Sequence, residues 1–193
     1  MKKSQIQAGV IKALSNSLTL AGYSKDIIER GGNLSLSLGL YSFAIEEYGK
    51  ASILTEIASS NQKEYPVPSI LFTGKKSHDL KFKTALSVLP KECTHYDAGV
   101  TFAEFPNLNQ KETFGVGHNG AEVIPKGNTG EYSLLDILID FKTRMNCFHL
   151  DWDEQKNNWK PPPKILPKFL IKSISEFEKF LNKKLDNAYG SRE

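Results

Sequence analysis

The sequence has few cysteines and lacks long apolar runs. Cys93 and Cys147 are the only cysteines in 193 residues; they are too few for a disulfide framework and suit a reducing cytosol. The N-terminal stretch MKKSQIQAGVIKALSNS has two lysines, but polar residues recur every second or third position after them. No apolar block of signal-peptide length is present there, and no run of ~18 apolar residues occurs anywhere. These absences predict a cytoplasmic protein with no membrane attachment.

Motifs of several enzyme classes are also missing. The chain contains neither a glycine-rich phosphate-binding loop nor a Gly-x-Ser-x-Gly sequence. Cys93, His95 and His118 lack the spacing of a zinc site, so we expect no metal and no cofactor. The formal net charge is only +3, which permits a polyanionic partner without requiring one. Composition and length are those of a globular protein with one domain, expected over 1–193.

Hydrophobic periodicity predicts helices through most of the chain. Apolar residues recur every fourth position over about 5–21, which indicates a first amphipathic helix. Gly31-Gly32 interrupts the chain, and Asn33 is a good cap for a second helix over 34–59. That helix is apolar nearly all round, so we expect it to be central. Further helices are predicted over about 77–89, 133–148 and 168–187.

One long segment does not have a helical pattern. Residues 91–130 contain six glycines and two prolines and show no sustained period. We expect an irregular excursion there, with a short β-hairpin around 113–124. Five helices with this single excursion predict an all-α bundle. The last helix, 168–187, has an apolar stripe opposite a lysine stripe, which we expect to face water, RNA or lipid, with water favoured.

The first candidate site is Glu46-Glu47-Tyr48-Gly49-Lys50 in the second predicted helix. A helical projection places Glu47 near the middle of the apolar arc. An ionised carboxylate there costs several kcal/mol unless it is paired, so Glu47 should meet a cation from another helix or face a cleft. Glu46 and Lys50 are four residues apart and are expected to pair at the surface. Gly49 is expected to allow the close approach of a neighbouring helix.

The second candidate site is the basic stretch from Lys75 to Lys83. It places four lysines and His78 at the start of a predicted helix. One interpretation is contact with an anion or an RNA backbone. The other is an ordinary solvated lysine face, which the composition alone favours.

The third candidate site is the sequence from Arg144 to Asp151. His149 comes five residues after Arg144, roughly 140° around an ideal helix. The two side chains converge only if the helix ends near Phe148 or if His149 turns toward a second subunit. Such a pair suits metal-free RNA cleavage, because histidine exchanges protons near neutral pH and arginine stabilises charge building on a phosphate.

Taken in order, these features resemble the AbiV family. The resemblance rests on A-I-E-E-Y-G-K-A from Ala44, the Lys/His-rich helix start, R-x4-H-L-D from Arg144, and a Trp-x-Pro element at Trp159. It covers most of the chain outside 91–130. AbiV proteins are bacterial abortive-infection proteins that stop phage multiplication, and they look like members of the HEPN superfamily. HEPN domains are up-and-down helical bundles, usually dimeric, and many are metal-independent ribonucleases.

The resemblance implies a homodimer in which Arg144 and His149 meet at the dimer cleft. It also implies that Glu47 pairs with Arg144 beside this cleft. The candidate catalytic residues are therefore Arg144, His149 and Glu47, and the candidate binding residues are Lys50, His78, Lys81 and Asp151.

Three functions stay open on the sequence. The first is a ribonuclease toxin that halts translation during phage infection. The second is a non-catalytic module that binds RNA, a phage protein or a host protein and blocks translation by occupancy. Met145 favours the second, because active HEPN ribonucleases often carry a polar residue immediately after the arginine. The third is a purely structural helical protein. No DNA specificity and no membrane partner are expected.

Overall fold

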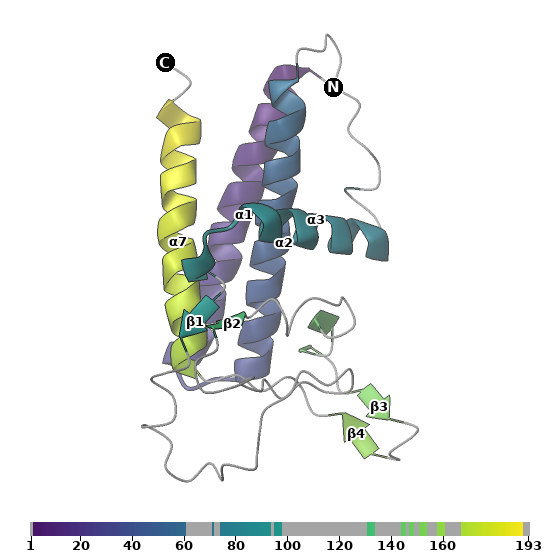
Figure 1. Ribbon diagram of the computed structural model, residues 1–193, viewed down its shortest axis with the longest axis vertical. Coiled ribbons are helices and arrows are strands. Elements are labelled where there is room, and N and C mark those ends of the chain that lie inside the picture. The colour runs from purple at the N-terminus through teal and green to yellow at the C-terminus, as the bar shows by residue number, and fades with distance from the viewer. Residues whose placement is uncertain are drawn as a thin grey trace.

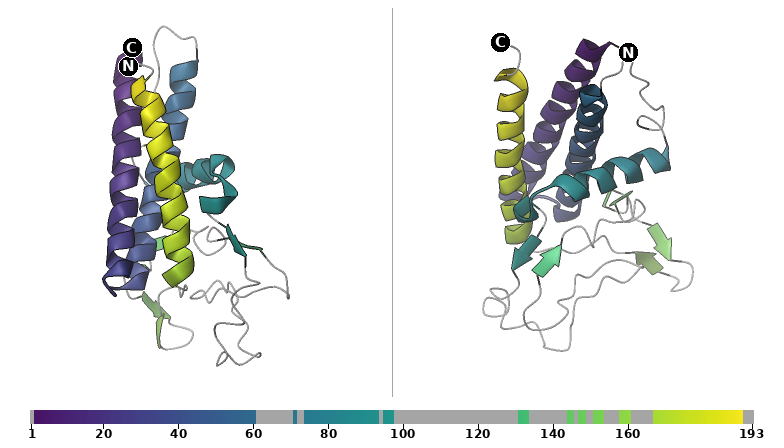
Figure 2. Two further views of the ribbon diagram at one scale, coloured as in Figure 1. Left: turned by 90° about the vertical axis from the view of Figure 1, so that its left-hand side faces the viewer. Right: turned by 45° about the horizontal axis from the view of Figure 1, so that its top comes forward.

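The computed structural model describes residues 2–60, 71, 74–93, 95–97, 131–133, 144–145, 147–148, 151–153, 158–160 and 167–190, and the statements below concern these residues. Four α-helices carry the fold: α1 (Lys3–Glu29), α2 (Leu34–Ser59), α3 (Lys75–Val88) and α7 (Pro167–Gly190). Helices α1, α2 and α7 run side by side, whereas α3 lies across α2 (Figures 1 and 2). The prediction of an all-α fold is confirmed, with α3 crossing the other helices rather than running along them.

Short elements flank the helices. A 3-10 turn, η2 (Lys91–Cys93), comes after α3. Two antiparallel strand pairs come next, β1 (His95–Asp97) with β2 (Glu131–Ser133) and β3 (Asp151–Asp153) with β4 (Asn158–Lys160). The prediction that a helix begins at Ser133 is wrong, because Ser133 pairs with His95 in the first of these ladders. Arg144 and Met145 are helical, while 134–143 and the expected hairpin at 113–124 lie outside the described residues.

The predicted boundary between the first two helices is confirmed. Gly31 has φ +69, a backbone conformation that glycine adopts without steric cost. Asn33 caps α2, since its side-chain oxygen accepts a hydrogen bond from the Leu36 N–H at 3.0 Å. The range 34–59 predicted for this helix is the range observed, whereas α1 continues past residue 21 to Glu29.

Buried serines bring α1 and α2 close together. The Ser24 hydroxyl lies 2.7 Å from the Ser37 carbonyl oxygen, and the Ser37 hydroxyl lies 2.7 Å from the Ser24 carbonyl oxygen. The Ser17 hydroxyl donates to the Ala44 carbonyl oxygen at 2.6 Å. These hydroxyls are buried at little cost because each has a hydrogen-bond partner. The part of α1 beyond the predicted end at residue 21 therefore packs on α2 through Ser24.

The main hydrophobic core lies between α1, α2 and α7. Tyr41 meets Phe177 edge to face, with ring centroids 5.6 Å apart. The Tyr41 hydroxyl is 2.7 Å from the Cys93 carbonyl oxygen and 3.2 Å from that of Ser173, so it connects α2 to η2 and α7. The predicted apolar stripe of the last helix is confirmed as the buried set Leu170, Ile174, Phe177, Leu181 and Leu185.

Gly49 lets α3 cross α2 at close range. A Cβ at this position would overlap the backbone carbonyl oxygen of Lys81 and lie 3.2 Å from the Ala85 backbone nitrogen. Both are main-chain atoms of a helix, so neither can swing away as a side chain would. The prediction that Gly49 admits a neighbouring helix is confirmed.

We expect Gly49→Ala to lower the free energy of unfolding by about 2 kcal/mol or more, because the added methyl forces α2 and α3 apart. Gly22→Ala is the matched control, since its Cβ would meet only Glu178 Oε1 at 3.8 Å. This control should be neutral or stabilising by up to ~1 kcal/mol. Urea unfolding monitored by circular dichroism measures both. Wild-type stability in Gly49→Ala would contradict the close crossing.

Candidate functional site

Arg144 is fully buried beside the crossing of α2 and α3. Its Nε donates to Glu46 Oε1 at 3.0 Å, and its Nη2 donates to Asp79 Oδ1 at 3.0 Å. The guanidinium carbon lies 4.2 Å from the centroid of the Phe82 ring. Helix α2 supplies Glu46, and α3 supplies Asp79 and Phe82 one turn apart. Arg144 therefore joins its own segment to two helices through charge-assisted hydrogen bonds.

Glu46 shares its carboxylate between two partners. Oε1 accepts from Arg144, while Oε2 lies 2.6 Å from His78 Nδ1. Glu46 is 2% exposed, and the His78 side chain is 34% exposed. Because an ionised carboxylate only accepts, His78 donates from Nδ1, so its neutral form carries the lone pair on Nε2. The arrangement holds one tautomer of a partly exposed imidazole.

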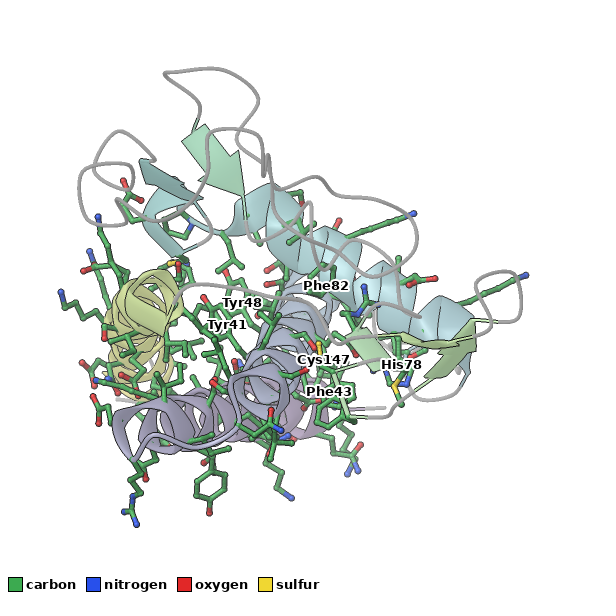
Figure 3. The ribbon with its side chains drawn as sticks, turned by 90° about the horizontal axis from the view of Figure 1, so that it is seen from below. Tyr41, Phe43, Tyr48, His78, Phe82 and Cys147 are labelled. Carbon is green, nitrogen blue, oxygen red and sulfur yellow. The ribbon has the colours of Figure 1, made fainter. Side chains whose placement is uncertain are left out.

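Figure 3 shows which side chains lie on the two sides of α2. Tyr41 and Tyr48 lie on the side of α2 that faces α7, whereas Phe43, His78 and Cys147 lie together on the side away from α7 (Figure 3). Phe43 stacks on Phe148 with ring centroids 5.1 Å apart. The segment that contains Arg144 packs on the side of α2 away from α7, where Cys147 belongs to the same hydrophobic cluster as Tyr41 and Phe82.

The predicted pairing of Glu47 with Arg144 is wrong, whereas the alternative expectation that Glu47 faces a cleft agrees with the structure. Glu46, not Glu47, pairs with Arg144, and Glu47 instead accepts two hydrogen bonds from Lys50 Nζ at 2.6 and 2.7 Å. This also replaces the expected Glu46–Lys50 surface pair. The Glu47–Lys50 pair lines a cavity of about 390 Å³ between α1 and α2. Glu47 thus lies at a different surface of α2 from the Arg144 cluster.

The prediction failed because large apolar residues do not mark the most closely packed face of α2. Gly39 and Ser42 lie seven and four residues before Glu46, and Gly49 lies three residues after it, so all four share one helical face. These small residues let the Arg144 segment and α3 approach α2 closely. Their spacing around Glu46 is the sequence signal that identifies it as the buried carboxylate.

Lys81 is also buried, at 6% exposure. Burial lowers the pKa of its ammonium, and Lys50 adds to that lowering while Glu46 and Glu47 oppose it. The interpretation of 75–83 as a solvated lysine face is therefore wrong for Lys81. It fits Lys76 and Lys83, which are exposed.

The structure brings together only some of the predicted site residues. Arg144 and His78 meet through Glu46, and Lys50 lies with Glu47 on α2. Asp151 begins β3, where its Cα partner is Lys160. His149 lies outside the described residues, so its convergence with Arg144 stays a prediction.

The two cysteines are poor nucleophiles. Burial raises the pKa of both the Cys93 and Cys147 thiols to about 12, so neither ionises appreciably near neutral pH. Within the part of the chain that the structure describes, no group of three or more His, Cys, Asp or Glu side chains is arranged to hold a metal ion. The described helices likewise include none with both the length and the apolar character needed to span a membrane.

The family model for AbiV, a HEPN family, matches residues 5–182. This span includes Glu46, His78, Lys81 and Arg144, and it ends within α7. The chain belongs to the AbiV family. The family predicted from the sequence is thereby confirmed. No curated protein and no solved structure matches the chain.

We expect Glu46→Gln to destabilise this AbiV protein by about 3–5 kcal/mol, because it leaves buried Arg144 with one carboxylate fewer. Glu47→Gln is the matched control, since it removes the same charge from the neighbouring position. Its partly exposed pair with Lys50 is worth at most about 1 kcal/mol. Urea midpoints measure both. An equal loss of stability in the two variants would contradict the claim that the Glu46–Arg144 pair stabilises the fold.

We expect Lys81→Met to be more stable than wild type at pH 7, since the charged ammonium is costly to bury. The pKa of Lys81 is lower in the folded chain than its ordinary value of 10.5. The cost is therefore complete below the folded pKa and disappears as pH rises through that pKa toward 10.5. The difference in unfolding free energy between Lys81→Met and wild type should be smaller at pH 10 than at pH 7. A difference independent of pH would contradict this.

Proposed function

We propose that this AbiV protein defends bacteria against phage by binding a component needed for translation or phage growth. Membership of the AbiV family supports the abortive-infection role. The proposed mode of action is occupancy of the target rather than cleavage by Arg144.

The burial of Arg144 is the observation that supports binding over cleavage. An arginine that stabilises a phosphate transition state must place its donors on the reacting oxygens. Arg144 has 0% of its side chain exposed, and Glu46 and Asp79 accept its hydrogen bonds. Breaking a buried ion pair costs about 3–5 kcal/mol. Arg144 is thus arranged to hold α2 and α3 together.

Metal-independent RNA cleavage by Arg144 and His149 is the second candidate function. The spacing of these residues favours it, and the family match covers both of them. Cleavage through this pair requires Arg144 to leave both carboxylates. We further propose that the protein acts in the cytoplasm as a homodimer, with RNA, a phage protein or a host protein as its partner.

Phage plating on cells that express variants separates the two mechanisms. We expect His149→Ala to restrict phage as wild type does, and the purified wild type to leave total tRNA and rRNA intact in EDTA. The double variant Lys76→Glu/Lys83→Glu should lose restriction, because it reverses two exposed charges on α3. Lys183→Glu is the control on α7, where it changes another exposed lysine.

Cleavage of RNA by wild type but not by His149→Ala would contradict the occupancy mechanism. Full restriction by the double α3 variant would exclude its basic surface as the binding surface. If the wild type itself does not restrict phage, the defensive role fails.

A further inference from the structure

The cavity of about 390 Å³ between α1 and α2 lies toward the end where α1 begins. The serine contacts that hold these two helices together lie further along α1, at Ser17 and Ser24. The cavity lies beyond them, between residues 5–16 of α1 and 47–54 of α2. Sites for small molecules have volumes of about 300–1,000 Å³. The cavity is therefore at the small end of that range and suits a compact molecule.

Part of the cavity wall is apolar. Ile6, Ala13 and Leu54 line it, and each of them is at most 4% exposed. Gly9 lies beside them, and a Cβ at this position would be 3.3 Å from Leu54 Cδ1. The backbone of α1 thus lies against Leu54 and closes this side. Such a wall binds an apolar part of a ligand, because both surfaces then leave water.

The Glu47–Lys50 ion pair forms the charged part of the wall. Lys50 Nζ donates to both oxygens of Glu47, and the two side chains are only 22% and 16% exposed for Lys50 and Glu47. Glu176 and Lys179 form an ion pair of the same spacing on α7, where Lys179 is 72% exposed. The pair on α7 is an ordinary solvated one. The Glu47–Lys50 pair is instead shielded from water and lines a cavity.

Both members of this pair keep hydrogen-bonding capacity. An ammonium has one donor more than the two hydrogen bonds that Glu47 accepts from Lys50. Each carboxylate oxygen of Glu47 accepts one of these bonds and has a further lone pair. A ligand in the cavity can therefore accept from Lys50 and donate to Glu47 without breaking the ion pair.

A fixed ion pair favours a ligand that carries two opposite charges of its own. A simple anion is attracted by Lys50 and repelled by Glu47, and a simple cation is attracted and repelled in the opposite way. A zwitterion places its carboxylate against Lys50 and its ammonium against Glu47, so both contacts are favourable. Lys12 and Asn16, both exposed, line the cavity as well and offer further donors to the carboxylate.

We propose that this cavity binds a free α-amino acid with an apolar side chain. The ligand carboxylate accepts from Lys50 Nζ, and the ligand ammonium donates to the Glu47 carboxylate. The apolar side chain of the ligand packs on Ile6, Ala13 and Leu54. The inference goes beyond the proposed defensive function and does not depend on it.

A series of four ligands on the wild-type chain tests the proposal. L-leucine carries both charges and an apolar side chain, 4-methylpentanoate lacks the ammonium, and 3-methylbutylamine lacks the carboxylate. L-serine keeps both charges but has a small polar side chain. We expect leucine to bind with a Kd of about 1 mM or below, and the other three to bind about fivefold more weakly or worse. Titration of ¹⁵N-labelled protein, followed by NMR, measures the four affinities.

The same spectra test where leucine binds. The amide signals that shift should include those of residues 5–16 and 47–54, which form the two sides of the cavity. Shifts confined to other residues would overturn the proposal.

The variant Glu47→Gln tests the contact with the ligand ammonium. It keeps the side-chain size and removes the negative charge, so leucine should bind about tenfold more weakly. Binding of 4-methylpentanoate should not weaken, because the repulsion from Glu47 is gone. Glu176→Gln is the matched control, since it removes the same charge from the solvated pair on α7. It should change leucine binding less than about twofold.

Several results would overturn the proposal. Binding of 4-methylpentanoate as tight as that of leucine would show simple attraction of an anion to lysines. Absence of leucine binding up to about 10 mM would show that the cavity is not an amino-acid site. Wild-type affinity in Glu47→Gln, or equal weakening by Glu176→Gln, would remove the role of the ion pair. If circular dichroism shows Glu47→Gln unfolded, the ligand series on the wild-type chain decides alone.

Discussion

The ion pairs of buried Arg144 with Glu46 and Asp79 constrain the packing around α2. Because the Arg144 guanidinium is buried, its charge must be paired within the protein. Glu46 of α2 and Asp79 of α3 supply the carboxylates, so α2 and α3 cross where both side chains reach Arg144. That crossing is close because Gly49 carries no side chain. Four residues after Arg144, Phe148 stacks on Phe43 and packs the segment against α2. The small residues of α2 and the charges of α3 are thus parts of one arrangement.

In the same arrangement, some charged side chains are held in ion pairs and others are not. Arg144 donates to the carboxylates of Glu46 and Asp79, and Lys50 is bound to Glu47. His78 is held by Glu46 yet stays partly exposed, while burial lowers the pKa of Lys81 against the opposing effect of Glu46 and Glu47. The exposed lysines near this cluster therefore lie on α3, whereas the arginine of the R-x4-H sequence is buried.

Much of the fold is determined by local sequence, while the site depends on contacts between distant residues. The bounds of α2, its Asn33 cap and the buried stripe of α7 could be predicted because periodicity and capping act within one helix. Glu46 could not be chosen over Glu47, since its burial depends on Arg144, 98 residues away. The sequence pattern predicted a helix beginning at Ser133, but its pairing with His95 places Ser133 in a strand. Lys81 looked solvent-facing because its burial comes from the crossing of α3 over α2.

The protection of the Arg144 side chain tests the structural role of this residue most directly. The chain has only three arginines, Arg30, Arg144 and Arg192, so their Nε–H signals are readily resolved by NMR in ¹⁵N-labelled protein. The Arg144→Lys variant assigns the signal. A buried, hydrogen-bonded Nε–H should exchange with solvent far more slowly than that of exposed Arg30. Rapid exchange at Arg144, equal to that of Arg30 in the folded protein, would contradict the account and make this arginine available for catalysis.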